Sequence, residues 1–318
     1  MEFTIENAIL HVLNNGEVRY SEEELDLDSD TVYSFVTKQI KKILSDSNGK
    51  ESIFNESSQS LAAVSAYIGG EINFREFSVK ICEKMSELIK EGFAGASDML
   101  VAKFSQKSRK HIALIKLKYK HRMTHNDSNQ IVNIPSIESG SFDDACVIGF
   151  DPVKLIVLEK PSEKDGSFYF SEVFLDCATE MSRKQAADII TAAFTEVNSK
   201  YFSDSPETEA KLKAALVENA IDDEGYVSAQ NAAAAAFSDN EEAKAEFIDA
   251  VKAEGLIKDV HLGEKFAKQQ FAAVKFKADN GVELKFPCGI YDDPNVIQFE
   301  AAPDGSFTVT LKNLRRSV

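Results

Sequence analysis

The chain has no tryptophan, and among its 318 residues there are only four cysteines and seven prolines. The cysteines, at positions 82, 146, 177 and 288, form neither a CxxC pair nor a short zinc-binding spacing. Because three of them stand beside apolar residues, we expect reduced thiols in the core rather than disulfides or metal ligands. No run approaches the roughly 20 apolar residues of a membrane-spanning helix, and the first residues lack a signal-peptide pattern. These absences predict a cytoplasmic protein without a membrane partner.

Signatures of catalysis are also missing. The chain has no Walker-type loop, no G-x-S-x-G nucleophile and no dinucleotide fingerprint. His121 and His125 are four apart, as some metal ligands are, but the charge of the adjacent Lys120 would oppose a divalent cation. Glu283-Leu284-Lys285 resembles part of a nuclease motif, yet the same Glu-x-Lys spacing recurs twice inside expected helices. We therefore predict no enzymatic activity, no metal and no cofactor, and keep a metal-dependent nuclease as a remote alternative.

Hydrophobic residues make up 43% of the chain, enough for one large domain or two smaller ones. The first part, residues 1–204, is expected to form an α+β domain with a mixed, mainly antiparallel sheet and flanking helices. Its periodicity predicts a hairpin over 5–20, helices over 30–44, 58–68, 74–91 and 182–202, and strands over 99–104, 111–120, 145–150, 153–158 and 167–175.

The second part, residues 205–318, is expected to be an acidic helical region that ends in β-hairpins. Ser205 precedes Pro206, which can occupy the first position of a helix. Between residues 201 and 260 there are fourteen acidic residues and five lysines, a surface better explained by solvation than by mimicry of DNA. Three or four short helices are predicted over 206–270, followed by the hairpins 271–277/282–286 and 296–300/307–311.

Charge is distributed unevenly along the chain. The formal net charge is −16, which would normally oppose a polyanionic partner. Residues 99–132, however, contain eight basic residues and one acid, Asp127, so this segment carries +7 and the remainder −23. The candidate nucleic-acid-binding residues are Lys103, Lys107, Arg109, Lys110, Lys116, Lys118, Lys120 and Arg122.

Strict alternation over residues 112–120 would place Lys116, Lys118 and Lys120 on one face of a strand, about 6.5 to 7 Å apart. This spacing resembles that of successive phosphates on a nucleic-acid strand and predicts contact with the backbone rather than with the bases. Aromatic residues that could stack on unpaired bases are sparse, which favours duplex DNA over single strands. The alternative reading is an edge strand whose lysines prevent aggregation.

Extended patterns throughout the chain resemble those of the bacterial nucleoid-associated proteins of NdpA type. The segments that carry the resemblance are IENAILHVLNN, LDLDSDTVYSFVTKQIKKIL, IVNIPSIESGSFDDACVIGFDPVKLIVLEK, YFSEVFLDCATEMSRKQAADIITAAF and VIQFEAAPDGSFTVTLKNL. The resemblance implies a location in the nucleoid, association with double-stranded DNA and self-association as a homodimer. We thus expect a DNA-binding protein with little sequence specificity. The alternative is an interaction adaptor in chromosome maintenance or phage defence, whose partner would be a topoisomerase or another nucleoid protein.

Overall fold

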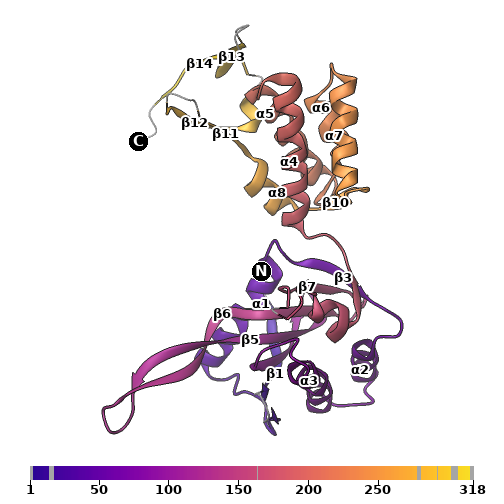
Figure 1. Ribbon diagram of the computed structural model, residues 1–318, viewed down its shortest axis with the longest axis vertical. Helices are drawn as coiled ribbons and strands as arrows, with labels where there is room; N and C mark the ends of the chain where they lie inside the picture. The colour runs from indigo at the N-terminus through magenta and orange to yellow at the C-terminus, as the bar shows by residue number, and fades with distance from the viewer. Residues whose placement is uncertain are drawn as a thin grey trace. The chain divides into compact units, whose positions relative to one another are not determined.

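The chain folds into two compact units, Met1–Ser182 and Arg183–Val318 (Figure 1). The computed structural model describes residues 3–13, 18–162, 164–277, 281–291, 293–301 and 307–315. The division differs from the boundary expected at 204/205, because helix α4 (Arg183–Phe202) packs on helices of the second unit. The rings of Phe194 and Phe202 both stack on Phe237, so α4 belongs to that unit and does not close the sheet of the first.

The first unit is built on an eight-stranded sheet with the order β2-β1-β4-β5-β6-β7-β3-β8. All neighbouring strands pair antiparallel, which confirms the predicted α+β class with a mainly antiparallel sheet. The strands are β1 (Thr4–Leu13), β2 (Val18–Arg19), β3 (Lys50–Phe54), β4 (Ser97–Gln106), β5 (Arg109–His125), β6 (Ile131–Gly149), β7 (Leu155–Leu158) and β8 (Cys177–Thr179).

Helices cover both faces of this sheet. On one face, α1 (Asp30–Ser45) buries Val36, Ile40 and Ile43 against alternate residues of β5, including Ala113 and Ile115. On the other face, α2 (Gln59–Ile68) and α3 (Phe74–Lys90) pack against the intervening residues of the same strand. The central part of β5 is therefore buried on both faces, whereas its two ends extend to the margins of the unit.

Two of these helices begin with a side-chain cap. Asn73 forms a capping box with Glu76 at the start of α3, and the Ser58 hydroxyl accepts a hydrogen bond from the Leu61 amide at the start of α2. At α1 the N-cap is Ser29, whose side chain forms no capping hydrogen bond. All four cysteines are buried and free, as expected.

One predicted strand is wrong. Within residues 167–175, the segment Phe170–Leu175 is a π-helical turn, η1. Phe170 and Phe174 lie on the same buried face with ring centroids 5.0 Å apart, and the hydroxyl of Ser60 in α2 donates a hydrogen bond to the Phe174 carbonyl. A short apolar run does not distinguish a strand from a buried helical turn, and packing against α2 decides in favour of the turn.

The second unit contains the predicted short helices and terminal hairpins. Its helices after α4 are α5 (Pro206–Asp222), α6 (Ala229–Ala236), α7 (Glu241–Ala253) and α8 (Glu264–Phe271). Its strands form the pairs β9 (Tyr226–Val227) with β10 (Val260–His261), β11 (Ala273–Lys277) with β12 (Glu283–Pro287), and β13 (Ile297–Ala301) with β14 (Phe307–Leu311), and a 3-10 turn, η2, spans Cys288–Ile290. The expected turns at 14–16, 279–280 and 303–305 lie outside the described residues. In the described part of the chain, no helix is both long and apolar enough to cross a bilayer.

Candidate nucleic-acid interface

The eight predicted cations do not form one surface. Strand β5 carries most of them, but its segment 112–117 is buried in the middle of the sheet. Three cations lie at the β4–β5 turn and three lie beyond the buried segment. Lys110 and Lys118 are eight positions apart, and a strand rises about 3.3 Å per residue, so the two groups are separated by about 26 Å along β5.

The first group, which we call the turn cluster, consists of Lys107, Arg109 and Lys110. All three residues are exposed, and none forms an ion pair with another described residue. The chain reverses tightly here, since Lys107 and Ser108 adopt φ values of 48° and 67°. The turn cluster therefore presents three cationic groups to solvent from a short, constrained segment.

Lys103 lies near the turn cluster but is already neutralised. Its Nζ atom is 2.8 Å from Oε2 of Glu6 on the neighbouring strand β1. The pKa of Glu6 is lowered, first by the hydrogen bond from Lys103, then by one from Ser105, and also by the charge of Lys110. Lys103 thus contributes less to an external anion site than the three exposed cations do.

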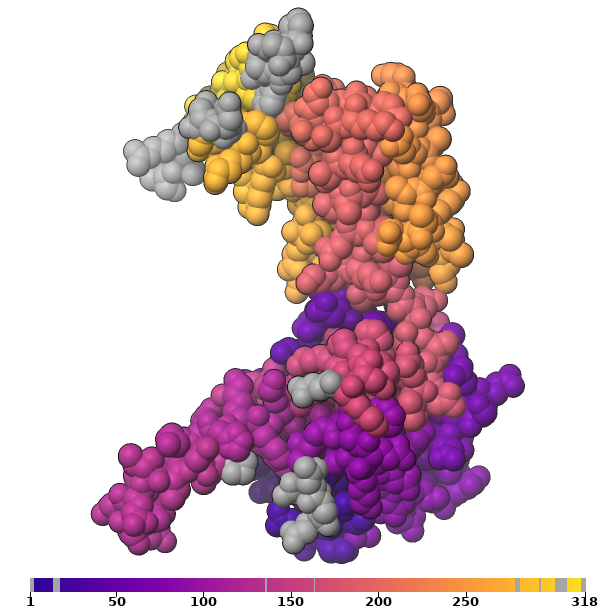
Figure 2. Space-filling model, in the orientation of Figure 1, coloured from indigo at the N-terminus to yellow at the C-terminus, as the bar shows by residue number. Residues whose placement is uncertain are grey.

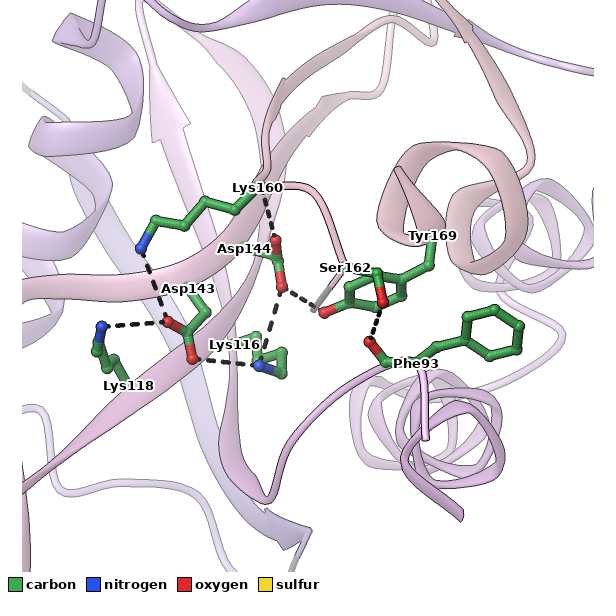
Figure 3. Close-up of polar contacts among 8 residues, drawn as sticks. All are labelled: Phe93, Lys116, Lys118, Asp143, Asp144, Lys160, Ser162 and Tyr169. Carbon is green, nitrogen blue, oxygen red and sulfur yellow. Dashed lines mark hydrogen bonds and ion pairs between the residues drawn. The ribbon is translucent and has the colours of Figure 1, made fainter. Parts of the chain in front are cut away.

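Lys116 is not on the surface at all. Its Nζ atom lies 3.2 Å from Oδ2 of Asp143 and 3.9 Å from Oδ2 of Asp144, and the residue is 4% exposed (Figure 3). Asp143 also faces Lys118 and Lys160, at 4.0 and 3.8 Å. Lys116 is therefore not exposed as the predicted phosphate contact requires, because two adjacent carboxylates on β6 hold its ammonium group inside the unit.

Asp144 connects this buried cluster to the segment that follows β7. Its Oδ1 accepts a hydrogen bond from the Lys160 amide at 3.1 Å, and its Oδ2 accepts one from the Tyr169 hydroxyl. Burial raises the pKa of Asp144, and burial together with this carboxylate raises that of Tyr169. The cluster lies beside a cavity of about 320 Å³, also lined by Phe93 and Ser162, whose hydroxyl donates to the Phe93 carbonyl at 3.1 Å (Figure 3).

Every charged group of this cluster has a partner within the protein, which indicates a structural role. Among the residues that the structure describes, no group of three or more His, Cys, Asp or Glu side chains is arranged to hold a metal ion. Two acidic residues in the sequence indicate this buried cluster, but they lie outside the basic segment 99–132. Asp143 and Asp144 immediately precede the apolar run 145–148, and they stand opposite a lysine-bearing strand.

The second group of cations lies on a projecting hairpin, which we call the arm and define as residues 118–138. Within the arm, β5 pairs with β6 from Tyr119↔Ile137 to His125↔Ile131. Two register shifts, at Lys116/Leu117 and Leu117/Tyr119, separate this pairing from that of the sheet. Both strands run out of the body of the first unit as a two-stranded ribbon (Figure 1).

The arm keeps two predicted cations on one face, but they share a carboxylate. Glu138 lies 2.5 Å from Nζ of Lys120 and 2.9 Å from a guanidinium nitrogen of Arg122. Hydrogen bonds from these two cations lower the pKa of Glu138. The side chains of Lys118, Lys120 and Arg122 are 48%, 50% and 61% exposed, so they remain accessible although partly neutralised.

A family model described as Nucleoid-associated protein YejK matches residues 9–318 of the chain. The match spans both compact units and includes the turn cluster and the arm. None of the curated proteins compared with the chain matches it.

Proposed function

Because the chain belongs to the family of nucleoid-associated protein YejK, we propose that it binds duplex DNA in the nucleoid through phosphate contacts, with little sequence specificity. The family establishes association with the nucleoid. We propose in addition that the chain contacts DNA directly, that the contacts are to phosphates, and that specific cationic residues make them.

The observation that carries this proposal is the turn cluster. Lys107, Arg109 and Lys110 lie in one tight turn and form no ion pair with another described residue, although the charge of Lys110 lowers the pKa of Glu6. In a chain with a net charge of −16, such a group of exposed cations without ion pairs is a local exception. Cations of this kind bind phosphates by releasing condensed counterions, a process that does not depend on the base sequence.

Two exposed arm cations, Lys120 and Arg122, extend the candidate surface but share Glu138. We expect the turn cluster to supply the larger part of the salt-dependent affinity and the arm to supply the remainder. Three phosphate contacts correspond to a slope of about −2.7 in a plot of log affinity against log salt concentration.

The test is a mobility-shift titration with random-sequence duplex DNA at several salt concentrations. The variant Lys107→Glu/Arg109→Glu/Lys110→Glu should lose most of its affinity and most of the salt slope. A matched control, Lys184→Glu/Lys252→Glu/Lys265→Glu, changes the net charge equally at three exposed positions of the second unit. If both triple variants lose affinity to the same extent, the effect is one of overall charge and the turn cluster is not the site.

A further inference from the structure

The two faces of the arm differ in chemistry. Register places Lys120 and Arg122 on one face, with Ile134 opposite Arg122; we call this the Arg122 face. The other, the Met123 face, carries Met123 opposite Asn133 and His125 opposite Ile131. No Lys, Arg, Asp or Glu side chain lies on the Met123 face between residues 119 and 125 or between 131 and 137.

Large apolar side chains on the Met123 face are unusually exposed. Met123 is 72% exposed and Ile131 is 77% exposed, and both lie near the tip of the arm. The space-filling view shows the arm as a narrow projection from the first unit (Figure 2). A two-stranded ribbon alone is marginally stable in water, so an arm with a bare apolar face is a surface suited to a partner.

We propose that the arm lies in the major groove of duplex DNA, with the Met123 face toward the base edges. This inference rests on the proposed function and specifies how DNA is engaged. The major groove is about 12 Å wide and about 8.5 Å deep and admits a two-stranded β-ribbon. Its floor is formed by base edges and its rims by phosphates, so a ribbon with one uncharged and one cationic face is complementary to it.

Charge decides the orientation of the arm in the groove. Lys120 and Arg122 are on the face directed to the groove mouth, from which their long side chains reach the phosphates on either rim. Apart from Tyr119, whose hydroxyl donates a hydrogen bond to Asp98, the polar groups of the Met123 face are histidine and asparagine side chains, which can hydrogen-bond to base edges without repelling the phosphates. A second copy of this chain fits less well, since its net charge of −16 complements the Arg122 face rather than the Met123 face.

The apolar contacts define the expected base preference. The major-groove edge of thymine displays a C5-methyl group that accepts apolar contacts. Burying one methyl group against Met123 or Ile131 should increase affinity about fourfold. The arm therefore adds a modest preference for thymine to binding that is otherwise nonspecific.

The experiment compares two duplexes of the same A·T-rich sequence, one with thymine and one with uracil at every such position. The duplexes have equal charge and equal pairing, and they differ by the methyl groups. Wild-type protein should bind the thymine duplex at least about fourfold more tightly. The variant Met123→Thr/Ile131→Thr keeps strand propensity and should bind the two duplexes equally, with its affinity for the uracil duplex unchanged. Ile257→Thr, a substitution at a residue 76% exposed in the second unit, is the control and should behave as wild type.

The outcomes separate this inference from the proposed function. If wild type binds both duplexes equally and the double variant has no effect, the arm does not read the groove, although the proposed function stands. If the wild-type protein binds neither duplex, the proposed function itself is wrong. Light scattering on the same variants tests the other occupant: a smaller assembly for Met123→Thr/Ile131→Thr would mean that the Met123 face covers a second copy, and would overturn the inference.

Discussion

The Nζ atom of Lys116 lies 3.2 Å from Oδ2 of Asp143, and the lysine side chain is 5% exposed. A buried ammonium group is tolerated when carboxylates and hydrogen bonds replace its hydration. Lys116 therefore belongs to the interior of the first unit, although its neighbours Lys118 and Lys120 are accessible. Lysines that look alike in the sequence therefore have different roles. Lys116 is held inside the fold by Asp143, whereas Lys118 and Lys120 are accessible to phosphates.

Replacing Lys116 by glutamate should destabilise the first unit by roughly 3 to 5 kcal/mol, because a third carboxylate would be buried beside Asp143 and Asp144. The free energy of unfolding from urea titration measures this. Lys116→Met retains the apolar stem and should bind DNA like wild type, since the ammonium group does not reach the surface. A large loss of DNA affinity in a folded Lys116→Met protein would contradict the structural role.

Glu138 should weaken the affinity of the arm for DNA, because it partly neutralises Lys120 and Arg122. Glu138→Gln keeps an acceptor for both cations but removes the charge. We expect tighter binding and a salt slope steeper by up to about 1.8, the value for two additional phosphate contacts. Glu56→Gln makes the same charge change at an exposed residue outside the arm and is the control. Equal salt slopes for the two variants would argue against arm contacts with phosphates.

His11 should make the first unit sensitive to mild acid. The ring is fully buried, its Nδ1 accepts a hydrogen bond from the Ser21 amide at 3.0 Å, and Nε2 lies 2.8 Å from the Ser78 hydroxyl. Burial, with a contribution from the charge of Arg75, lowers the pKa of His11 to about 4. The unfolded chain, with an ordinary histidine pKa of about 6.5, takes up the proton first as the pH falls.

The stabilisation associated with neutral His11 is therefore complete above about pH 6.5 and is lost as the pH falls toward 4. Each decrease of one pH unit in this window lowers the free energy of unfolding by up to about 1.4 kcal/mol. In His11→Asn, the side-chain oxygen can still accept from the Ser21 amide but does not titrate. Urea titrations at pH 7 and pH 5 should show a smaller pH effect in the variant than in wild type; an equal effect would assign the acid sensitivity to other groups.

Elements defined by local chemistry were predictable. The apolar periodicity of α1 and α3 predicted both helices nearly to the residue, and alternation identified β5 as a strand. The strands β3 and β8 were missed because they are short and contain few apolar residues, so their pairing rather than their composition defines them. The segment at Phe170 was misassigned since its burial depends on α2.

The candidate site was predictable only in part. Alternation predicted Lys116, Lys118 and Lys120 on one face of a strand, but Lys116 is buried and two register shifts fall between Lys116 and Tyr119. The burial of Lys116 could not be derived from alternation, because it depends on Asp143, 27 residues later on the neighbouring strand. The separation of the cations into two groups likewise follows from the helices that cover the middle of β5.

The two register shifts between Lys116 and Tyr119 have a consequence for how this fold can vary among relatives. In an uninterrupted sheet, slipping one strand by one residue would move its apolar side chains to the wrong face. Here the irregular pairing falls at the base of the arm, so residues gained or lost farther out leave the alignment of Ile112 with Ile148 as it is. Lengthening or shortening the hairpin is thus compatible with an unchanged hydrophobic core, and evolution can adjust its reach independently of the body that holds it.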